Sequence, residues 1–140
     1  MTEAVKAKPP EVTEAEWAIM KVVWEHQPCA AGTVQEALAR ELGWAYSTVK
    51  TTMDRMVGKG LLEITRIRNL QLFSAKVDRR QVAGWEFRRM LSRAFDGALG
   101  PMMQYLVENE ELSQEDLEQL RKAVDSAKKT PESNRSRRKP

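Results

Sequence analysis

The sequence predicts a mainly α-helical chain that contains one small β-hairpin. Three segments before residue 60 repeat apolar residues at steps of three and four, which is the helical period. Residues 62–75 alternate apolar and polar side chains, as strands do, and the helical period returns from residue 78. Three helices followed by a hairpin form a winged helix-turn-helix, so we expect this fold at the N-terminus and a helical region after it.

Composition limits the chain to one domain with an appendage. The 140 residues have a mass of 16.0 kDa, and 41% of them are hydrophobic, which is enough for a modest core. No apolar run approaches the length of a membrane span, and the first residues do not resemble a signal peptide. The single cysteine, Cys29, cannot form an intrachain disulfide. We therefore expect a cytoplasmic protein without membrane insertion.

Charge and composition divide the chain into four parts. Residues 1–11 contain Pro9–Pro10 and are expected to be a disordered arm, followed by a winged-helix domain at 12–77 and helices at 78–127. Residues 128–140 carry six Lys or Arg side chains and one acidic residue. We interpret this tail as a disordered, solvated segment, and weak electrostatic binding to a polyanion is the alternative.

The first helix is expected to begin with a capping box. Thr13 is the N-cap, and Glu16 stands at the position that bonds back to the cap. Pro28 ends the helix because it lacks the required N–H. The expected buried stripe is Trp17, Met20, Val23 and Trp24.

A second and a third helix follow, each ended by a glycine. The second is predicted to start at Thr33, with Glu36 again at the box position, and to stop at Gly43. The third is predicted from Tyr46 to about Lys59 and stops at Gly60. One side of the second helix carries Val34, Ala37, Leu38 and Leu42; one side of the third carries Tyr46, Val49, Met53, Met56 and Val57, which we expect in the core.

The hairpin is expected to turn at Arg68–Asn69. Two strands flank this dipeptide, and they are predicted to share one apolar face. The apolar residues assigned to that face are Leu62, Ile64, Leu70 and Leu72.

The outward side of the third helix points to nucleic-acid binding. Serine and threonine are weaker helix formers than Ala, Glu or Gln, yet they fill this side together with cations. Short hydroxyl side chains allow close approach to DNA and can bond bases or phosphates, while Lys and Arg contact phosphate or guanine. Asp54 is the one discordant residue there. The predicted DNA contacts in this helix are Ser47, Thr48, Lys50, Thr51, Thr52 and Arg55, and those in the wing are Arg66, Arg68 and Asn69.

The C-terminal helices carry narrow apolar stripes with polar flanks, which indicates a partner chain. A helix from Asp78 ends near Gly97, a short one follows Gly100–Pro101, and Ser113 caps the last. We predict that this region forms a homodimer. The expected dimerisation residues are Phe87, Leu91, Phe95, Met102, Leu106, Leu117, Leu120 and Val124.

No residue pattern indicates catalysis, a metal or a cofactor. One histidine, His26, and one cysteine give no metal-ligand spacing. Neither a nucleophile–base pair, a pair of catalytic carboxylates nor a glycine-rich phosphate loop is evident in the sequence. An enzyme is therefore not expected.

Three segments together resemble the penicillinase-repressor family (BlaI/MecI type). They are "TEAEWAIMKVVWE", "GTVQEALARELGWAYSTVKTTMDRMVGKGLLE" and "ELSQEDLEQLRKAV", and the resemblance covers about residues 12–127. It implies a winged-helix repressor that dimerises through its C-terminal helices and binds a palindromic double-stranded DNA operator with TACA/TGTA-like half-sites. It also implies release by an upstream signal: in well-known members, a membrane sensor with a metalloprotease domain causes cleavage in the dimer region.

Two departures from the family bear on regulation. The position that matches the Asn-Phe bond cleaved in penicillinase repressors is Tyr105–Leu106 here, and it is the candidate cleavage position. The paired cysteines of copper-responsive relatives are absent from the tail. The alternative function is a protein-interaction module whose winged helix no longer binds DNA.

Overall fold

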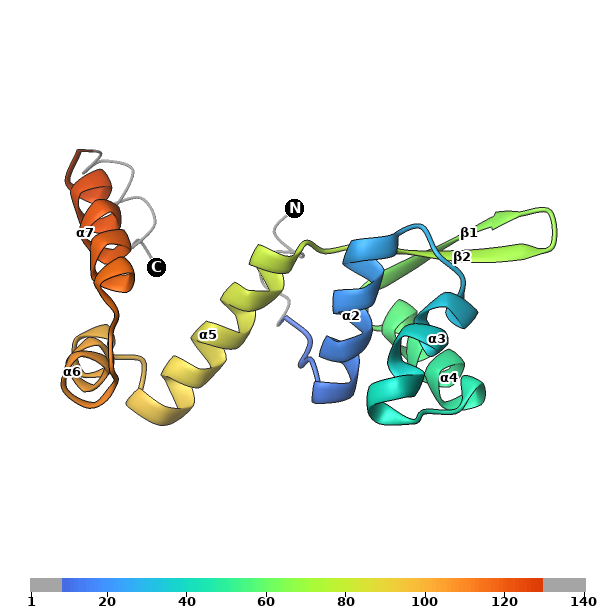
Figure 1. Cartoon of the computed structure of the whole chain (residues 1–140), viewed down its shortest axis with the longest axis horizontal. Helices are drawn as coiled ribbons and strands as arrows, with labels where there is room; N and C mark the ends of the chain where they lie inside the picture. The colour runs from blue at the N-terminus through green and yellow to red at the C-terminus, as the bar shows by residue number, and fades with distance from the viewer. Residues whose placement is uncertain (1–8, 130–140) are drawn as a thin grey trace. The chain divides into compact units, whose positions relative to one another are not determined.

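The computed structural model describes residues 9–129, and its order of elements confirms the predicted fold class (Figure 1). The first three helices are α2 (Glu14–His26), α3 (Ala31–Leu42) and α4 (Tyr46–Gly58), followed by the antiparallel strands β1 (Leu62–Ile67) and β2 (Leu70–Ala75). The last three helices are α5 (Arg79–Phe95), α6 (Leu99–Asn109) and α7 (Gln114–Lys129). Most of the predicted arm and tail, residues 1–8 and 130–140, lies outside the described residues.

The chain divides into two compact units within α5, at Met90 and Leu91. The sequence placed the boundary before α5, between residues 77 and 78. The first half of α5 belongs to the N-terminal unit because Val82 is fully buried and Trp85 packs against the same core. Helix periodicity alone does not show which part of a long helix a neighbouring core covers.

The core of the N-terminal unit joins its helices to the hairpin. Met20 and Val23 of α2 are fully buried, as predicted, while Trp17 and Trp24 are half-buried and meet edge to face, with ring centroids 6.0 Å apart. Ile19 is also buried, so the α2 stripe is wider than the sequence suggested. The other fully buried residues from this unit's later elements are Val34, Val49, Met53, Met56, Leu61, Leu62, Phe73 and Val82.

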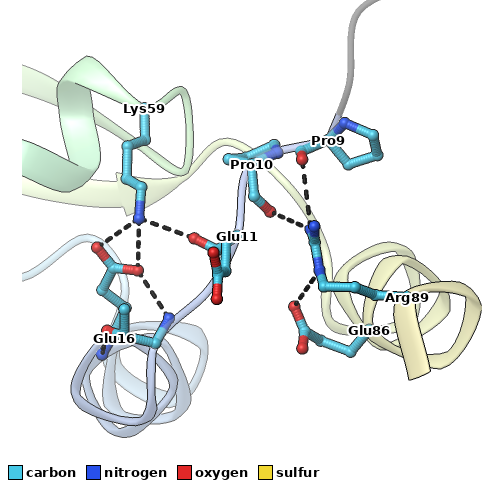
Figure 2. Close-up of polar contacts among 8 residues, drawn as sticks. Pro9, Pro10, Glu11, Glu16, Lys59, Glu86 and Arg89 are labelled. Carbon is cyan, nitrogen blue, oxygen red and sulfur yellow. Dashed lines mark hydrogen bonds and ion pairs between the residues drawn. The ribbon is translucent and has the colours of Figure 1, made fainter. Parts of the chain in front are cut away.

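An ion pair between a buried carboxylate and a half-buried lysine connects the start of α2 to the end of α4. The Thr13–Glu16 capping box is confirmed: the backbone N–H of Glu16 donates to the Thr13 hydroxyl at 3.2 Å, and that of Thr13 donates to the Glu16 carboxylate at 2.9 Å. Glu16 is buried, and Lys59 Nζ, just after α4, lies 2.8 and 2.9 Å from its two oxygens (Figure 2). One carboxylate therefore caps one helix and fixes the end of another.

Residues 9–11 of the predicted disordered arm make specific contacts instead. Arg89 of α5 donates to the carbonyl oxygens of Pro9 and Pro10 at 3.3 and 3.1 Å, and Lys59 donates to that of Glu11 at 2.7 Å (Figure 2). The sequence did not indicate these contacts because they join residues 48 to 80 positions apart. We call Pro9–Glu11 the N-terminal strap.

The second helix begins earlier than predicted. Its N-cap is Ala30, which makes no side-chain cap, so Thr33 lies inside the first turn and the expected Thr33–Glu36 box is wrong. Backbone bonds between Cys29 and Phe73, at 2.7 and 3.0 Å, fix the chain just before this start. Gly43 ends α3 at φ +63°, a conformation that glycine tolerates best, as expected. Leu42 is exposed rather than covered.

The hairpin turns at Arg68–Asn69 as predicted, but its apolar face differs. A two-residue turn pairs Ile67 with Leu70, and Ile64 then lies opposite Phe73. Because side chains alternate across a sheet, Phe73 shares the face of Ile64, and the predicted grouping of Leu70 and Leu72 with it is wrong. Phe73 is fully buried and anchors the hairpin to the helices.

The described part of the C-terminal unit has no buried core of its own. Among residues 91–128 no side chain is buried, and Leu117 and Val124 are each 47% exposed. Ser113 caps α7 as predicted, since its hydroxyl accepts from the Asp116 backbone N–H at 3.0 Å. Within residues 9–129, none of the helices has the length and apolar character that crossing a membrane requires.

Candidate nucleic-acid interface

Helix α4 has a buried side and an exposed polar side. Val49, Met53 and Met56 are fully buried, as the predicted core face requires. Tyr46 is an exception, because it is 52% exposed. It is the first residue of the helix, so no preceding helical turn covers it. The exposed polar residues are Ser47, Thr48, Thr51, Asp54 and Arg55, while Lys50 and Thr52 are half-buried.

The N-terminus of α4 is free of side-chain caps. Its N-cap is Ala45, which has no side chain able to accept from the first backbone N–H groups. Gln35 of α3 donates to the carbonyl oxygen of Trp44 at 3.1 Å and thereby holds the turn that leads into α4. Uncapped N–H groups at a helix start can bind an anion such as phosphate. Ser47 and Thr48 lie in this first turn.

Two of the predicted contact residues use their polar groups within the helix. The Thr52 hydroxyl donates to the carbonyl oxygen of Thr48 at 2.8 Å. Lys50 Nζ lies 3.0 and 2.9 Å from the two carboxylate oxygens of Asp54, one turn further on. The Arg55 side chain, by contrast, bonds to no other residue in the described part of the chain, and its guanidinium is exposed.

The wing presents two exposed arginines and an asparagine. Arg66 lies on β1 opposite Gln71, and Arg68 and Asn69 form the turn that extends beyond the helices of the N-terminal unit (Figure 1). Their apolar neighbours are exposed too: Ile67, which the sequence pattern did not single out, and Leu70, which was expected on the apolar face, are 54% and 52% exposed. A two-residue turn at Arg68–Asn69 makes Ile67 and Leu70 the first pair of the hairpin, so the turn in the sequence is the signal for this pair.

Arg68 adopts a conformation that disfavours any residue with a Cβ. Its φ is +59°, in the left-handed region. We expect Arg68→Gly to raise the free energy of unfolding by about 1 kcal/mol, because glycine relieves this strain. The same change removes a cation, so the slope of log affinity for DNA against log salt should fall by about one unit.

Urea unfolding and salt-dependent DNA titration measure the two effects of Arg68→Gly. Arg66→Ala is the matched control: it should lower the salt slope equally without stabilising the fold, because Arg66 lies in a strand. An unchanged salt slope in both variants would contradict a phosphate contact by the wing.

The described residues contain no group of three or more His, Cys, Asp or Glu side chains placed to hold a metal ion. Cys29 is buried, and burial raises the pKa of its thiol. A raised pKa keeps this thiol protonated, which suits a packing role.

Comparison with known proteins gives a consistent group of relatives. The family model described as penicillinase repressor matches residues 12–126. The chain is 26% identical to the penicillinase repressor of Bacillus licheniformis over 121 residues, covering 86% of this chain and 94% of that protein. It is 22% identical to the methicillin resistance regulatory protein MecI of Mammaliicoccus sciuri over 111 residues, covering 79% and 90%.

One solved structure also aligns with the chain. The monomeric form of B. licheniformis BlaI in complex with the blaP half-operator aligns with a TM-score of 0.47 and 26% identity. The alignment covers 53% of this chain and 90% of that one.

Proposed function

Because this chain belongs to the penicillinase repressor family, we propose that it is a transcriptional repressor that binds operator DNA as a homodimer. The observation that carries the proposal is the outward side of α4, on which short hydroxyl side chains and Arg55 are exposed above a fully buried apolar side. A solvated helix rarely needs hydroxyls there, since they weaken it. A DNA-contacting helix gains from them because they permit close approach in the major groove.

Base contacts are assigned to the middle of the exposed side. Thr51 is exposed there, flanked by Ser47 one turn before it and Arg55 one turn after it. Thr48, Lys50 and Thr52 complete the proposed set, with Lys50 and Thr52 held by the contacts described above. Arginine can bond guanine through two N–H groups, while serine and threonine can bond several bases.

Arg66, Arg68 and Asn69 are proposed to contact the DNA backbone. A guanidinium donates several N–H bonds and suits phosphate oxygens, and both arginines are exposed. Such contacts carry no sequence information directly, but they fix the orientation of α4 in the groove.

Dimerisation is proposed for the C-terminal unit. Residues 91–128 of this unit include no buried side chain, and exposed apolar residues such as Leu99, Leu117 and Val124 would be covered by a second copy. Phe87 is an exposed residue of the N-terminal unit, and the other seven proposed dimer residues lie in the C-terminal unit. A two-fold dimer matches a palindromic operator, because each winged helix binds one half-site.

Release from DNA is proposed to act on the dimer region through an upstream signal. The bond Tyr105–Leu106 lies in the middle of α6, with Tyr105 exposed and its ring centroid 6.2 Å from that of Phe95. A protease from a membrane sensor pathway would have to unwind α6 to cleave there, since helical backbone does not fit an extended protease cleft. The proposed site of action is the cytoplasm.

Arg55→Ala and Thr51→Ala test the base contacts. We expect each substitution to weaken binding to the selected operator by roughly 1–3 kcal/mol and to affect random DNA much less. Gel shifts with both DNAs measure this difference. Lys21→Ala, which removes a cation from the exposed surface of α2, is the control and should leave the ratio of the two affinities unchanged.

The alternative function, a protein-interaction module, is favoured by one observation, the exposed Ile67–Leu70 pair at the wing tip. The same assay separates the two functions. A wild-type protein that binds neither the operator nor random DNA would contradict the repressor proposal and favour the alternative.

A further inference from the structure

Asp54 is an acidic residue on the side of α4 that is proposed to face DNA. Its side chain is 48% exposed, and it lies one turn after Lys50, whose side chain is 29% exposed. Residues three and seven positions earlier, Thr51 and Ser47, share its side of the helix and are exposed too. A carboxylate at this place would repel phosphate, so it needs an explanation in a DNA-binding surface.

The ion pair with Asp54 limits what Lys50 can do. Both carboxylate oxygens of Asp54 accept from Lys50 Nζ, at 3.0 and 2.9 Å. The two charges cancel locally, so the pair offers little attraction to a DNA backbone and releases few counterions. As long as the contact holds, Lys50 does not act as a free phosphate-binding cation.

The Asp54 carboxylate also retains lone pairs that can accept a hydrogen bond. An ionised carboxylate has about four acceptor positions, and Lys50 occupies two of them. The major groove offers acceptors on guanine, adenine and thymine, and its only donors are the amino groups of cytosine and adenine. A carboxylate is therefore repelled by most base edges and attracted by an amino group.

We propose that Asp54 is a specificity-determining residue: it holds Lys50 away from phosphates and accepts a hydrogen bond from an exocyclic amino group of cytosine or adenine in the major groove. The inference rests on the proposed function. The side chain of Asp54 is short, and the small neighbouring hydroxyl residues permit the close approach that this bond requires.

Asp54→Ala tests the base contact by selection from a random duplex library. The wild-type protein should select sites in which one position of each half-site is always cytosine or always adenine. Asp54→Ala should accept any base at that position while keeping its preference at the others. The base lost from the selected sequence identifies which amino group is bound.

The salt dependence of binding to random DNA tests the restraint on Lys50. Asp54→Ala should bind random DNA more tightly and with a slope steeper by about one unit, because Lys50 is freed. Lys50→Ala should change this slope little in the wild-type background and by about one unit in the Asp54→Ala background. Glu111→Ala removes the same charge from the C-terminal unit and is the control that should change neither quantity.

The outcomes separate this inference from the proposed function. If the wild-type protein selects an operator and Asp54→Ala selects the same one with the same stringency, the role of Asp54 is refuted and the repressor function stands. If the wild-type protein selects no sequence, the repressor function fails and the inference fails with it. Thermal unfolding of each variant checks that the fold is retained.

Discussion

Removing residues 98–140 should lower affinity for a two-half-site operator by about 10²- to 10⁴-fold, because two linked winged helices bind far better than two separate ones. The N-terminal unit should survive the truncation, since every buried hydrophobic residue in the described part of the chain belongs to it. The truncated protein is therefore expected to be a folded monomer. Its affinity for a single half-site should equal that of the full chain measured on the same DNA.

Sedimentation and DNA titration measure these two properties. Leu117→Asp is a less disruptive companion, because it places a charge on an exposed apolar residue of α7 and leaves the N-terminal core intact. It should dissociate the dimer in the same way. A truncated chain that still sediments as a dimer would contradict the assignment of dimerisation to the C-terminal unit.

Phe73→Ala should lower the free energy of unfolding by about 3–5 kcal/mol, which is the usual cost of deleting a buried aromatic ring. Phe73 is fully buried. Its backbone exchanges two hydrogen bonds with Cys29, so the hairpin and the chain before α3 depend on the same residue. Loss of the ring should also loosen the wing and thereby reduce DNA affinity, although the substitution changes no charge.

Urea unfolding followed by tryptophan fluorescence measures the stability of this variant. Leu70→Ala, on the same strand, is the matched control and should cost well under 1 kcal/mol, because Leu70 is exposed at the wing tip. Equal destabilisation by the two substitutions would refute the anchoring role of Phe73.

Local sequence signals predicted the ends of elements well. The Thr13–Glu16 box, the stop at Gly43 and the turn at Arg68–Asn69 each depend on a few consecutive residues, and the structure confirms all three. The Thr33–Glu36 box failed although it has the same spacing. A cap depends on the path of the preceding chain, which the Cys29–Phe73 contact sets.

Contacts between distant segments could not be predicted in this way. Glu16 and Lys59 are 43 positions apart, and neither sequence context indicates the other. The face of Phe73, by contrast, follows from the two-residue turn, because pairing Ile67 with Leu70 places Phe73 opposite Ile64. The Lys50–Asp54 pair has the i, i+4 spacing of helical ion pairs, and that spacing was the available signal.

The N-terminal strap limits where an affinity tag can be placed at the N-terminus. Pro9 and Pro10 are bound by Arg89, and Glu11 is bound by Lys59, directly after the proposed DNA-contacting helix. An affinity tag fused immediately before Pro9 would disturb the hydrogen bonds that these carbonyl groups accept, and with them the C-terminal end of α4. Binding constants measured with such a fusion would then include an effect of the tag. A flexible spacer or removal of the tag avoids this artefact.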